Sequence, residues 1–401
     1  MTEILERRAA ICGLGISDVG RRLGIHPTDL TEVASRAAIA DAGLTPADID
    51  GIASLGDTPP AEAATRLGID ATWVNGRGPV NGGLLTPVMS ACFAVASGQA
   101  RHVLVYRTVQ MMGGSVLPGG ADGGEGADGG RAAGGEAEAS EGLADLAAMM
   151  ADIAIPLTYH AYSAANWLAL HARRHMATYG TTKEQLGWLA ITSRDHAALN
   201  PRAAYRAPMT MEDYLGARPI SDPFGLFDCD VPVDGSIAVV VSAADHAADC
   251  PHPAVRVHAV GGSDGPGGWY QRPDYPRMAS ADAARQMWSR SELGPGDLDV
   301  AELYDGFTFL TLAWLEALGV CGDGESGPFV EGGDRIRIGG QLPLNTYGGQ
   351  LSAGRMHGYW VLHEACLQLR GEAGPRQVAD AEVAVVSNGG GPIAGCMLLT
   401  R

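Results

Sequence analysis

The sequence predicts an α/β fold made of two similar halves, and the main observation behind this prediction is an internal repeat. Residues 44–50 (Leu-Thr-Pro-Ala-Asp-Ile-Asp) and residues 293–299 (Leu-Gly-Pro-Gly-Asp-Leu-Asp) share their Leu, Pro and Asp positions. Each heptad follows a stretch of helical composition, residues 31–42 in the first half and 280–291 in the second. Two copies in the same order indicate a duplicated strand–helix–turn–strand unit, which is typical of parallel βαβ architecture.

Apolar runs predict the strands of each half. Short apolar runs bounded by glycine or turn residues are typical of buried strands. These runs occupy residues 9–15 and 102–106 in the first half, and residues 255–262 and 382–387 in the second. We therefore place one half at 1–250 and the other at 251–401, joined near a Cys-Pro-His-Pro turn at residues 250–253.

The first half carries a long insertion at residues 113–222. Its first part, residues 113–142, is rich in Gly, Ala, Asp and Glu and has almost no large apolar residue. Such a stretch buries too little surface to offset the entropy lost on ordering, so we expect a surface loop. Helical patterns follow at 153–179 and 182–199, and Thr181 or Thr182 is suited to cap the second helix.

Composition excludes several classes of partner. The net charge of −18 argues against nucleic acid or an anionic membrane as the main partner, because both require a basic surface. No apolar run approaches the ~18 residues of a membrane span, and the first residues are too charged for a signal peptide. The seven cysteines are scattered and form no C-x-x-C pair. We therefore expect a cytoplasmic protein with reduced cysteines and no zinc ribbon.

Two motifs in the last hundred residues carry candidate chemistry. Residues 302–308 read Glu-Leu-Tyr-Asp-Gly-Phe-Thr, and residues 345–355 read Asn-Thr-Tyr-Gly-Gly-Gln-Leu-Ser-Ala-Gly-Arg. Each contains one tyrosine, Tyr304 or Tyr347. A phenol has an ordinary pKa near 10, donates a strong hydrogen bond, and can transfer a proton when its charged form is stabilised. A packing role remains the alternative for both tyrosines.

These motifs resemble the active-site frame of the thiolase superfamily, specifically its lipid-transfer-protein-like (SCP-x/Ltp) branch. In that branch the first motif usually reads His-Asp-Cys-Phe, so Tyr304 takes the place of the histidine. The second motif usually continues into Gly-His-Pro-x-Gly, whereas residues 354–358 here read Gly-Arg-Met-His-Gly. The resemblance covers nearly the whole chain and is weakest at 113–142. It implies the thiolase fold, in which two βαβ-rich halves give a five-layer αβαβα arrangement.

The acyl-transfer chemistry of thiolases is missing from this frame. The stretch that matches the nucleophile region, residues 73–83, has no Cys, Ser or Thr between Asn75 and Gly83. Covalent acyl transfer from this position is therefore unavailable, and Cys92 further on is expected to be a small buried hydrophobe. The second family cysteine is replaced by Ser387. Arg355 aligns with the activating histidine and cannot act as a base at neutral pH.

Other catalytic designs fit the sequence less well. A Schiff-base aldolase requires a buried lysine, but the single lysine, Lys183, lies in a polar helix start where we expect it to be solvated. A metal aldolase requires clustered ligands, and the best pair, His171 and His175, encloses two arginines that disfavour a cation. Residues 13–15 (Gly-Leu-Gly) lack the third glycine of a dinucleotide-binding fingerprint.

Thiolase-like enzymes with tyrosines in these motifs resemble the steroid side-chain-cleaving aldolases of actinobacteria. The resemblance implies retro-aldol cleavage of a β-hydroxyacyl-CoA, of the 17-hydroxy steroid type, into a ketone and propionyl-CoA. Such a lyase requires a group that takes the hydroxyl proton, donors for the thioester enolate, and an acid for the enolate carbon. We predict that Tyr304 and Tyr347 fill the two proton roles, in an order left open. No metal is expected, and no cofactor either, since CoA is part of the substrate.

Eight further residues are predicted to contact the substrate or to shape its site. Backbone amides of the glycine turn at 389–391 are candidate enolate donors, whereas Asp305 and Asn345 are more suited to holding backbone turns or orienting the tyrosines. The predicted set is Asp305, Asn345, Gly348, Gly349, Arg355, His357, Gly390 and Gly391.

The resemblance also implies partners, and two other functions stay open. We expect a homodimer bound to a partner with an OB-like DUF35 domain, with Leu84 to Ala96 and His102 to Tyr106 as candidate dimer surfaces. The first alternative is a non-catalytic acyl-CoA-binding scaffold. The second is a thiolase or acyltransferase that uses an unaligned cysteine such as Cys321 or Cys366.

Overall fold

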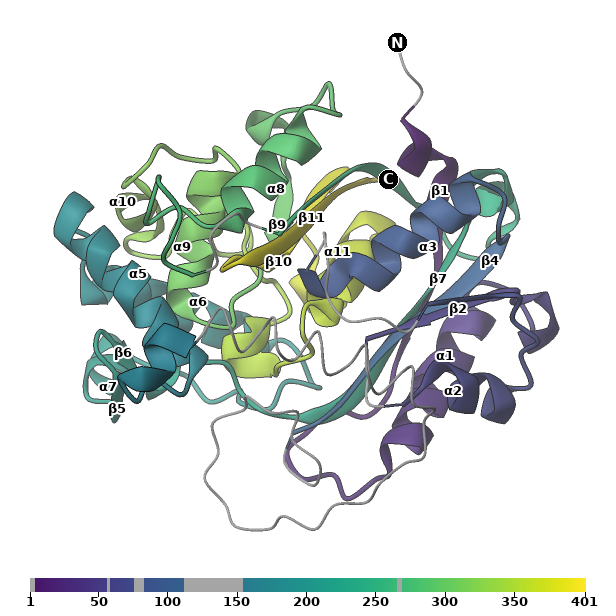
Figure 1. Cartoon of the computed structure of the whole chain (residues 1–401), viewed down its shortest axis with the longest axis horizontal. Helices are drawn as coiled ribbons and strands as arrows, with labels where there is room; N and C mark the ends of the chain where they lie inside the picture. The colour runs from purple at the N-terminus through teal and green to yellow at the C-terminus, as the bar shows by residue number, and fades with distance from the viewer. Residues whose placement is uncertain (1–3, 56–57, 76–82, 112–153, 265–268) are drawn as a thin grey trace.

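The structure, a computed structural model, describes residues 4–55, 58–75, 83–111, 154–264 and 269–401 (Figure 1). Nine strands form one mixed sheet in the order β3-β2-β4-β7-β1-β8-β11-β10-β9. The strands of this sheet are β1 (Ala9–Ile16), β2 (Gly51–Ser54), β3 (Trp73–Asn75), β4 (His102–Gln110), β7 (Asp234–Ala243), β8 (Val255–Asp264), β9 (Val300–Glu302), β10 (Val383–Gly389) and β11 (Ile393–Thr400). A separate hairpin consists of β5 (Pro219–Ser221) and β6 (Phe224–Gly225).

The predicted repeat is confirmed by the order and direction of the strands. In the first half β2 pairs parallel with β4, β4 antiparallel with β7, and β7 antiparallel with β1. In the second half β9 pairs parallel with β10, β10 antiparallel with β11, and β11 antiparallel with β8. The two half-sheets meet where β1 pairs with β8, at Ala10 and Arg256. The same four-strand unit therefore occurs twice, and β3 extends the first copy.

Helices cover both faces of each half-sheet. They are α1 (Pro27–Asp41), α2 (Pro60–Leu67), α3 (Thr86–Ala96), α5 (Ala164–Tyr179), α6 (Lys183–Ala198), α7 (Met211–Leu215), α8 (Ala279–Trp288), α9 (Thr308–Ala317), α10 (Ser326–Val330) and α11 (Tyr359–Arg370). Helices α3 and α11 share one central core with strands of both half-sheets. Helix α1 builds a second core on the outer face of the first half-sheet, and α8 and α9 build a third on the outer face of the second. The predicted five-layer αβαβα arrangement is therefore confirmed.

Strand β4 shows why the apolar runs in the sequence are continuous. Val103 and Val105 belong to the central core, whereas Leu104 and Tyr106 belong to the outer core of the first half. Side chains of a strand alternate between faces, and both faces of this strand are covered by helices. The same alternation occurs in the second half at Val385, which faces the outer core, between Ala384 and Val386.

Glycines let one helix approach each half-sheet closely. A Cβ atom at Gly15 on β1 would lie 2.0 Å from the carbonyl oxygen of Ala34 on α1. At the matching place in the second half, a Cβ atom at Gly261 on β8 would lie 2.0 Å from the carbonyl oxygen of Ala283 on α8. The Gly-Leu-Gly run at residues 13–15 therefore serves helix–sheet packing, in agreement with its rejection as a nucleotide fingerprint.

The insertion forms helices that lie beside the second half (Figure 1). Thr182 caps α6, because its hydroxyl accepts from the amide of Gln185 at 3.2 Å while the Gln185 side chain accepts from the amide of Thr182 at 3.0 Å. The helix expected over 153–179 is interrupted: Ser163 and Asn166 form a second capping box that starts α5. The loop expected at 113–142 lies outside the described residues.

The structure corrects one of the two candidate dimer surfaces, and the other, Leu84 to Ala96, stays a prediction. Strand β4 is paired along both edges, with β2 and β7, so residues 102–106 offer no free edge to a second chain. Helix α3 lies in the central layer, although Phe93 on it is exposed. In the described part of the first half-sheet the outermost strand is β3, where Val74 is exposed.

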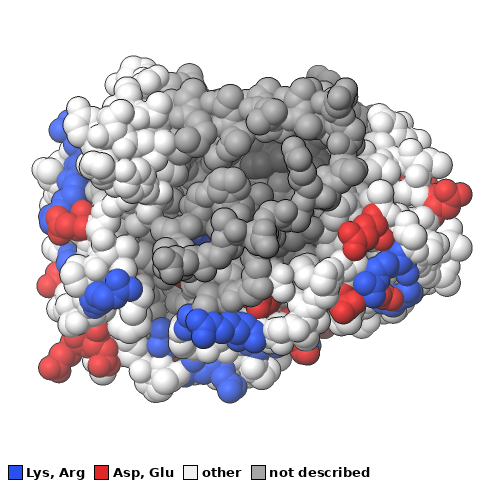
Figure 2. All heavy atoms as spheres, turned by 60° about the horizontal axis from the view of Figure 1, so that its bottom comes forward, with Lys and Arg blue, Asp and Glu red and all other residues white. Residues whose placement is uncertain are grey.

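Charged side chains of both signs lie on the described surface. Figure 2 shows basic and acidic side chains close to one another toward the rim of the face in view, rather than a wholly basic field. Among the helices of the described residues, none is long and apolar enough to cross a membrane.

Because α1 lies so close to β1, adding one methyl group at Gly15 should lower the stability of the fold. Gly15→Ala should destabilise the fold by about 1–3 kcal/mol, because the new Cβ meets backbone atoms that have no freedom to rotate away. The matched control is Gly296→Ala, where nothing lies within 4 Å of the added atom. Chemical denaturation of both variants checks the prediction. Equal stabilities of the two variants would show that α1 shifts without cost.

Candidate active site

The fold brings the two tyrosine motifs together through Asn345. The first motif continues from β9, and the backbone amide of Asn345 donates to the carbonyl oxygen of Ala301 on this strand at 3.1 Å. The side-chain oxygen of Asn345 accepts from the amide of Leu303 at 2.6 Å. Asn345 is buried and has a positive φ of 48°, a conformation that asparagine tolerates better than most residues. It therefore joins two segments that lie 42 residues apart.

Tyr347 is a fully buried phenol whose hydroxyl has no hydrogen-bond partner among the described residues. Its ring stacks on Trp360, with the ring centroids 5.2 Å apart, and its carbonyl oxygen accepts from the Asn200 side chain at 2.9 Å. Burial raises the pKa of Tyr347 well above the ordinary value, and the nearby Asp305 raises it further. Leaving a buried hydroxyl unpaired costs free energy, so this atom has a hydrogen-bonding capacity that the described residues do not use.

Tyr304 lies where the first motif meets the end of β10. Its amide donates to the hydroxyl oxygen of Ser387 at 2.9 Å, and its ring folds back over Gly306, where a Cβ would lie 2.9 Å from the ring. Burial, followed by the charge of Asp230, raises the pKa of Tyr304, while Arg355 acts in the opposite direction. Both tyrosines are therefore neutral O–H donors at neutral pH.

Asp305 holds the loop that follows Tyr347. One carboxylate oxygen accepts from the amide of Gln350 at 2.8 Å and the other from the amide of Leu351 at 3.4 Å. A Cβ atom at Gly349 would lie 2.0 Å from this carboxylate, and Gly348 and Gly349 both have positive φ. The loop forms a π-helical turn, Gly349–Ala353, a feature frequent at functional sites. Burial raises the pKa of Asp305 to about 6, although the two amides oppose this shift.

Arg355 and His357 lie on the same loop and have different partners. The guanidinium of Arg355 lies 3.4 Å from the carboxylate of Asp230, whose pKa burial raises to about 6 against the opposing effect of Arg355. Arg107, a buried residue of β4, lies 2.6 Å from Nδ1 of His357. Because arginine only donates, Nδ1 of His357 accepts and carries no proton. Burial and then Arg107 lower the pKa of His357 well below its usual range, so the ring is neutral and its Nε2–H is a donor.

The glycine turn after β10 differs from its prediction. The amide of Gly390 donates to the carbonyl oxygen of Ile393 at 3.0 Å, so it is occupied and cannot bind an enolate oxygen. Gly391 instead uses its carbonyl oxygen to bind the amide of Ala279 at 2.9 Å, and a Cβ at Gly391 would lie 2.6 Å from the ring of Trp269. The amide of Gly390 is therefore excluded as an enolate donor, whereas the role of the Gly391 amide stays a prediction.

Two residues that hold parts of the site together were not predicted from the sequence. Asn388 is buried; its oxygen accepts from the amide of Leu84 at 2.7 Å and its nitrogen donates to the carbonyl oxygen of His357 at 3.1 Å. Asn388 therefore links Leu84, just before α3, to the loop that contains His357. Arg107 is the other. A charged residue inside the apolar run of β4 was the available signal, but its partner lies 250 residues away.

The thiols are poorly suited to covalent catalysis. All seven cysteines are free, and Cys92 is buried as predicted. Burial raises the pKa of Cys92, Cys321 and Cys366 to about 12 in each case. Because the thiolate is the nucleophile, these protonated thiols are inert at neutral pH.

The remaining candidates have structural partners. Lys183 was expected to be solvated, but it is half-buried, forms an ion pair with the fully buried Asp228 and lies over the ring of Tyr214. His175 lies 3.0 Å from the carboxylate of Glu316, and His171 packs among aromatic rings. Within the described residues there is no cluster of His, Cys, Asp and Glu that could hold a metal ion.

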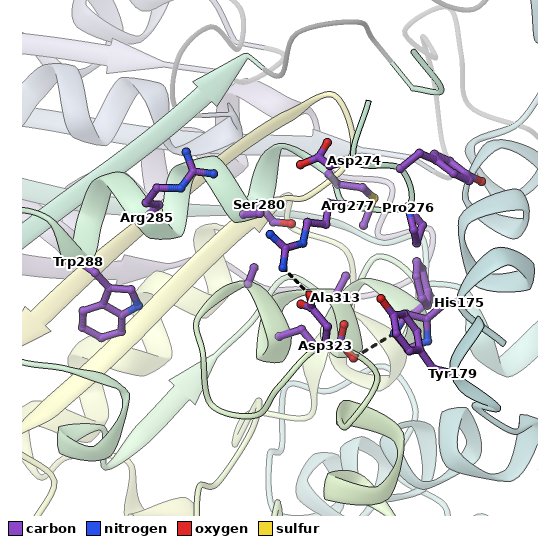
Figure 3. Close-up of a pocket in the computed structure, with 16 residues that line it drawn as sticks. His175, Tyr179, Asp274, Pro276, Arg277, Ser280, Arg285, Trp288, Ala313 and Asp323 are labelled. Carbon is purple, nitrogen blue, oxygen red and sulfur yellow. Dashed lines mark hydrogen bonds and ion pairs between the residues drawn. The ribbon is translucent and has the colours of Figure 1, made fainter. Parts of the chain in front are cut away.

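A cavity of about 320 Å³ lies away from the tyrosines. It is enclosed by α5, α8, α9 and the segment 274–278, and Figure 3 shows His175 and Tyr179 on one side and Arg285 and Trp288 on the other. Neither catalytic candidate, Tyr304 nor Tyr347, lines this cavity.

The fold and the site define a thiolase-fold protein whose pocket motifs carry phenols in place of the acyl-transfer groups. Comparison with known proteins agrees with this class: residues 268–399 match the family model described as "Thiolase C-terminal domain-like". A "Steroid side-chain-cleaving aldolase" of Thermomonospora curvata is 35% identical, with 98% of both chains covered. A "17-hydroxy-3-oxo-4-pregnene-20-carboxyl-CoA lyase" of Mycobacterium tuberculosis is 34% identical over 98% of this chain and 100% of the relative.

A solved structure gives the same result. The structure of an "Ltp2-ChsH2(DUF35) aldolase" superimposes with a TM-score of 0.87 at 33% identity and covers 99% of both chains. The chain described here therefore belongs to the steroid side-chain-cleaving aldolase family of the thiolase superfamily.

The two buried aspartates predict the acid limb of the pH profile. Asp230 and Asp305 have raised pKa values of about 6, and both act as charged acceptors in the site. As the pH falls through 6 they become neutral, and the bonds that hold Arg355 and the loop after Tyr347 weaken. We expect kcat to fall below about pH 6 and to be level from pH 7 to 8. A level kcat between pH 5 and 8 would contradict this prediction.

Proposed function

We propose that this chain is a carbon–carbon lyase that cleaves a β-hydroxyacyl-CoA by a retro-aldol reaction. The observation that carries the proposal is the pair of buried phenols, Tyr304 and Tyr347, in motifs of a thiolase fold whose thiols are protonated. The names of the relatives support a steroid side-chain CoA thioester of the 17-hydroxy type as the substrate class. The products would be a ketone and propionyl-CoA.

The reaction needs proton transfer and charge stabilisation only. A base removes the proton of the β-hydroxyl group, the bond between the α and β carbons breaks, and its electron pair forms the thioester enolate. An acid then protonates the α carbon of this enolate. The net change moves one proton from oxygen to carbon, so neither an oxidant nor a covalent intermediate is required. General acid–base catalysis of this kind contributes about 10²–10⁴-fold in rate.

The raised pKa values constrain how the tyrosines work. Each phenol is protonated before substrate binds, which suits it to donate a hydrogen bond to the hydroxyl or carbonyl oxygen of the substrate. Proton removal by one phenol then requires simultaneous proton donation, because a phenolate near Asp305 is unfavourable. Which tyrosine acts as the base and which as the acid stays open, since burial is the main cause of the raised pKa in both.

His357 is the best donor for the enolate oxygen. Its Nε2–H is free to donate because Nδ1 accepts from Arg107, and the fixed tautomer needs no reorganisation during the reaction. This role replaces the amide of Gly390, which is occupied by Ile393. We assign to Arg355, which is balanced by Asp230, the binding of a thioester or phosphate oxygen of the substrate.

No cofactor beyond the CoA of the substrate is part of this proposal, because side chains of the protein are assigned to every proton transfer and to the enolate. The scaffold alternative predicts acyl-CoA binding without cleavage. The thiolase alternative requires a reactive cysteine, and the raised pKa values of Cys321 and Cys366 argue against it.

Removing the phenolic oxygen of Tyr347 tests the proposal. Tyr347→Phe should fold normally, since the hydroxyl makes no hydrogen bond to the described residues, and should lower kcat by about 10²–10⁴-fold. Tyr304→Phe should lower kcat in the same range. Steady-state cleavage of a β-hydroxyacyl-CoA is the measurement.

The matched control is Tyr359→Phe. Tyr359 is also fully buried, and its hydroxyl has no partner among the described residues, but it lies on α11 outside the two motifs. It should retain kcat within about threefold. Equal activities of the Tyr347 and Tyr359 variants would exclude Tyr347 from the chemistry, and a wild type that binds but never cleaves acyl-CoA would favour the scaffold alternative.

We further propose a homodimer that recruits a DUF35-type chain, in a cytoplasmic complex. The similar solved structure, an Ltp2-ChsH2(DUF35) aldolase, supports the partner. Strand β3 is the outermost described strand of the first half-sheet, and its exposed Val74 fits a two-fold contact.

Co-expression followed by size-exclusion chromatography tests the assembly. We expect a complex of two copies of each chain, and Val74→Lys on the β3 edge should shift it toward one copy of each. The control substitution Val33→Lys changes an equally exposed valine on α1. A fully active monomer without any partner would contradict both parts of the proposal.

A further inference from the structure

The first motif begins with a buried carboxyl group that the proposed reaction does not use. Glu302 is the last residue of β9 and is fully buried. Its Oε1 accepts from the amide of Thr346 at 3.1 Å and from the hydroxyl of Thr346 at 2.6 Å. Its Oε2 has no hydrogen-bond partner among the described residues. Neutral donors therefore hold this carboxyl group, and no described cation forms an ion pair with it.

A second buried carboxyl group reaches the same hydroxyl. Glu364 on α11 lies 3.1 Å from Oγ1 of Thr346. The guanidinium of Arg376 binds both oxygens of Glu364, at 2.8 and 2.9 Å, in the paired geometry typical of an ionised carboxylate. Gln368 also donates to Oγ1 of Thr346, at 2.9 Å. Two carboxyl groups thus meet at one threonine, and a single arginine binds one of them.

Counting charges and protons assigns a state to each carboxyl group. The single cation, Arg376, neutralises Glu364, so a second negative charge on Glu302 would be buried without a partner at a large cost. The hydroxyl group of Thr346 has one proton and can donate it to only one of the two carboxyl groups. The contact with the other carboxyl group therefore needs a proton from that carboxyl group itself. Burial and then the charge of Glu364 raise the pKa of Glu302 well above its ordinary value; Asp305 adds to this effect, and the bonds from Thr346 oppose it.

We propose that Glu302 is held as a neutral carboxylic acid and that, through Thr346, it positions Tyr347. Thr346 directly precedes Tyr347 in the chain, and Glu302 lies two residues before Tyr304, so the pair links both tyrosine motifs behind the site. A neutral Glu302 also keeps a further negative charge away from the phenol of Tyr347. The effect of this arrangement on kcat rests on the proposed function, whereas the protonation state of Glu302 does not.

The pH dependence of stability tests the proton on Glu302. The unfolded state loses this proton near pH 4.3, whereas the folded state keeps it to a higher pH. Between those two values the folded state binds one more proton, so the unfolding constant rises about tenfold per pH unit from this group alone. In Glu302→Gln this rise is absent. The ratio of unfolding constants, wild type over variant, should therefore grow about tenfold per pH unit from pH 5 to 7.

An exposed glutamate supplies the control. Glu212→Gln removes an exposed carboxyl group in the first turn of α7, away from the histidines of the described residues, so its ratio should be constant from pH 5 to 7. A constant ratio for Glu302→Gln would overturn the proposal. Should Glu302→Gln fail to fold, infrared spectra of the wild type at pH 8 decide the matter: the carbonyl band of a protonated carboxylic acid supports the proposal, and its absence overturns it.

A threonine variant tests the positioning role. Thr346→Val removes the hydroxyl that bridges the two carboxyl groups and should lower kcat about ten- to hundredfold with KM little changed, because a displaced Tyr347 affects the chemical step. Thr311→Val is the matched control, a buried threonine of α9 whose hydroxyl has no partner among the described residues. Equal kcat values for the two variants would overturn the role. A wild type without lyase activity would refute the proposed function alone, since the stability test remains valid.

Discussion

The site depends on the contact by which Asn345 joins the end of β9 to the loop of Tyr347. Its amide and side chain bind the backbone of Ala301 and Leu303, which fixes the position of one tyrosine motif relative to the other. Further hydrogen bonds then position the rest of the site. Asp305 then holds the turn after Tyr347, and Asn388 binds the loop of His357 to the start of α3. Hydrogen bonds to backbone position the two motifs, and stacking on Trp360 adds to the placement of the Tyr347 ring.

Burial then sets the chemistry. The same removal from water raises the pKa of both phenols and of Asp305, and it lowers the pKa of His357. It also raises the pKa of the buried thiols. The two phenols and His357 are therefore neutral donors at neutral pH, beside the charged Asp305. Neutral donors suit a reaction that creates an enolate and moves a proton, and they do not suit attack by a thiolate.

Much of the fold could be predicted because short sequence patterns indicate its helices, strands and turns. The heptads at 44–50 and 293–299, with their helices and strands, repeat in one order, and the structure shows the same four-strand unit twice. The break before α5 was missed because the Ser163–Asn166 capping box lies within a longer stretch of helical composition. Residues 102–106 were wrong as a free dimer edge, because an apolar run does not tell whether it is paired within its own chain.

The site was predicted only in part, and the failures share one cause. Tyr304, Tyr347, Asp305 and Asn345 lie in continuous motifs, so their proximity could be expected. The pairs Arg107–His357 and Lys183–Asp228 join residues far apart in sequence, and no local pattern reports them. The amide of Gly390 was assigned to a ligand because its bond to Ile393 depends on a turn geometry that three glycines alone do not specify.

The central claim is that carbon–carbon cleavage proceeds without a covalent acyl-enzyme. The most direct measurement is the intact mass of the enzyme, quenched in acid during turnover of a β-hydroxyacyl-CoA while release of propionyl-CoA is followed in the same samples. We expect product to accumulate while the protein keeps its unmodified mass at every time point. An acyl adduct that forms and decays at the rate of turnover, mapped to any of the seven cysteines, would contradict the non-covalent mechanism.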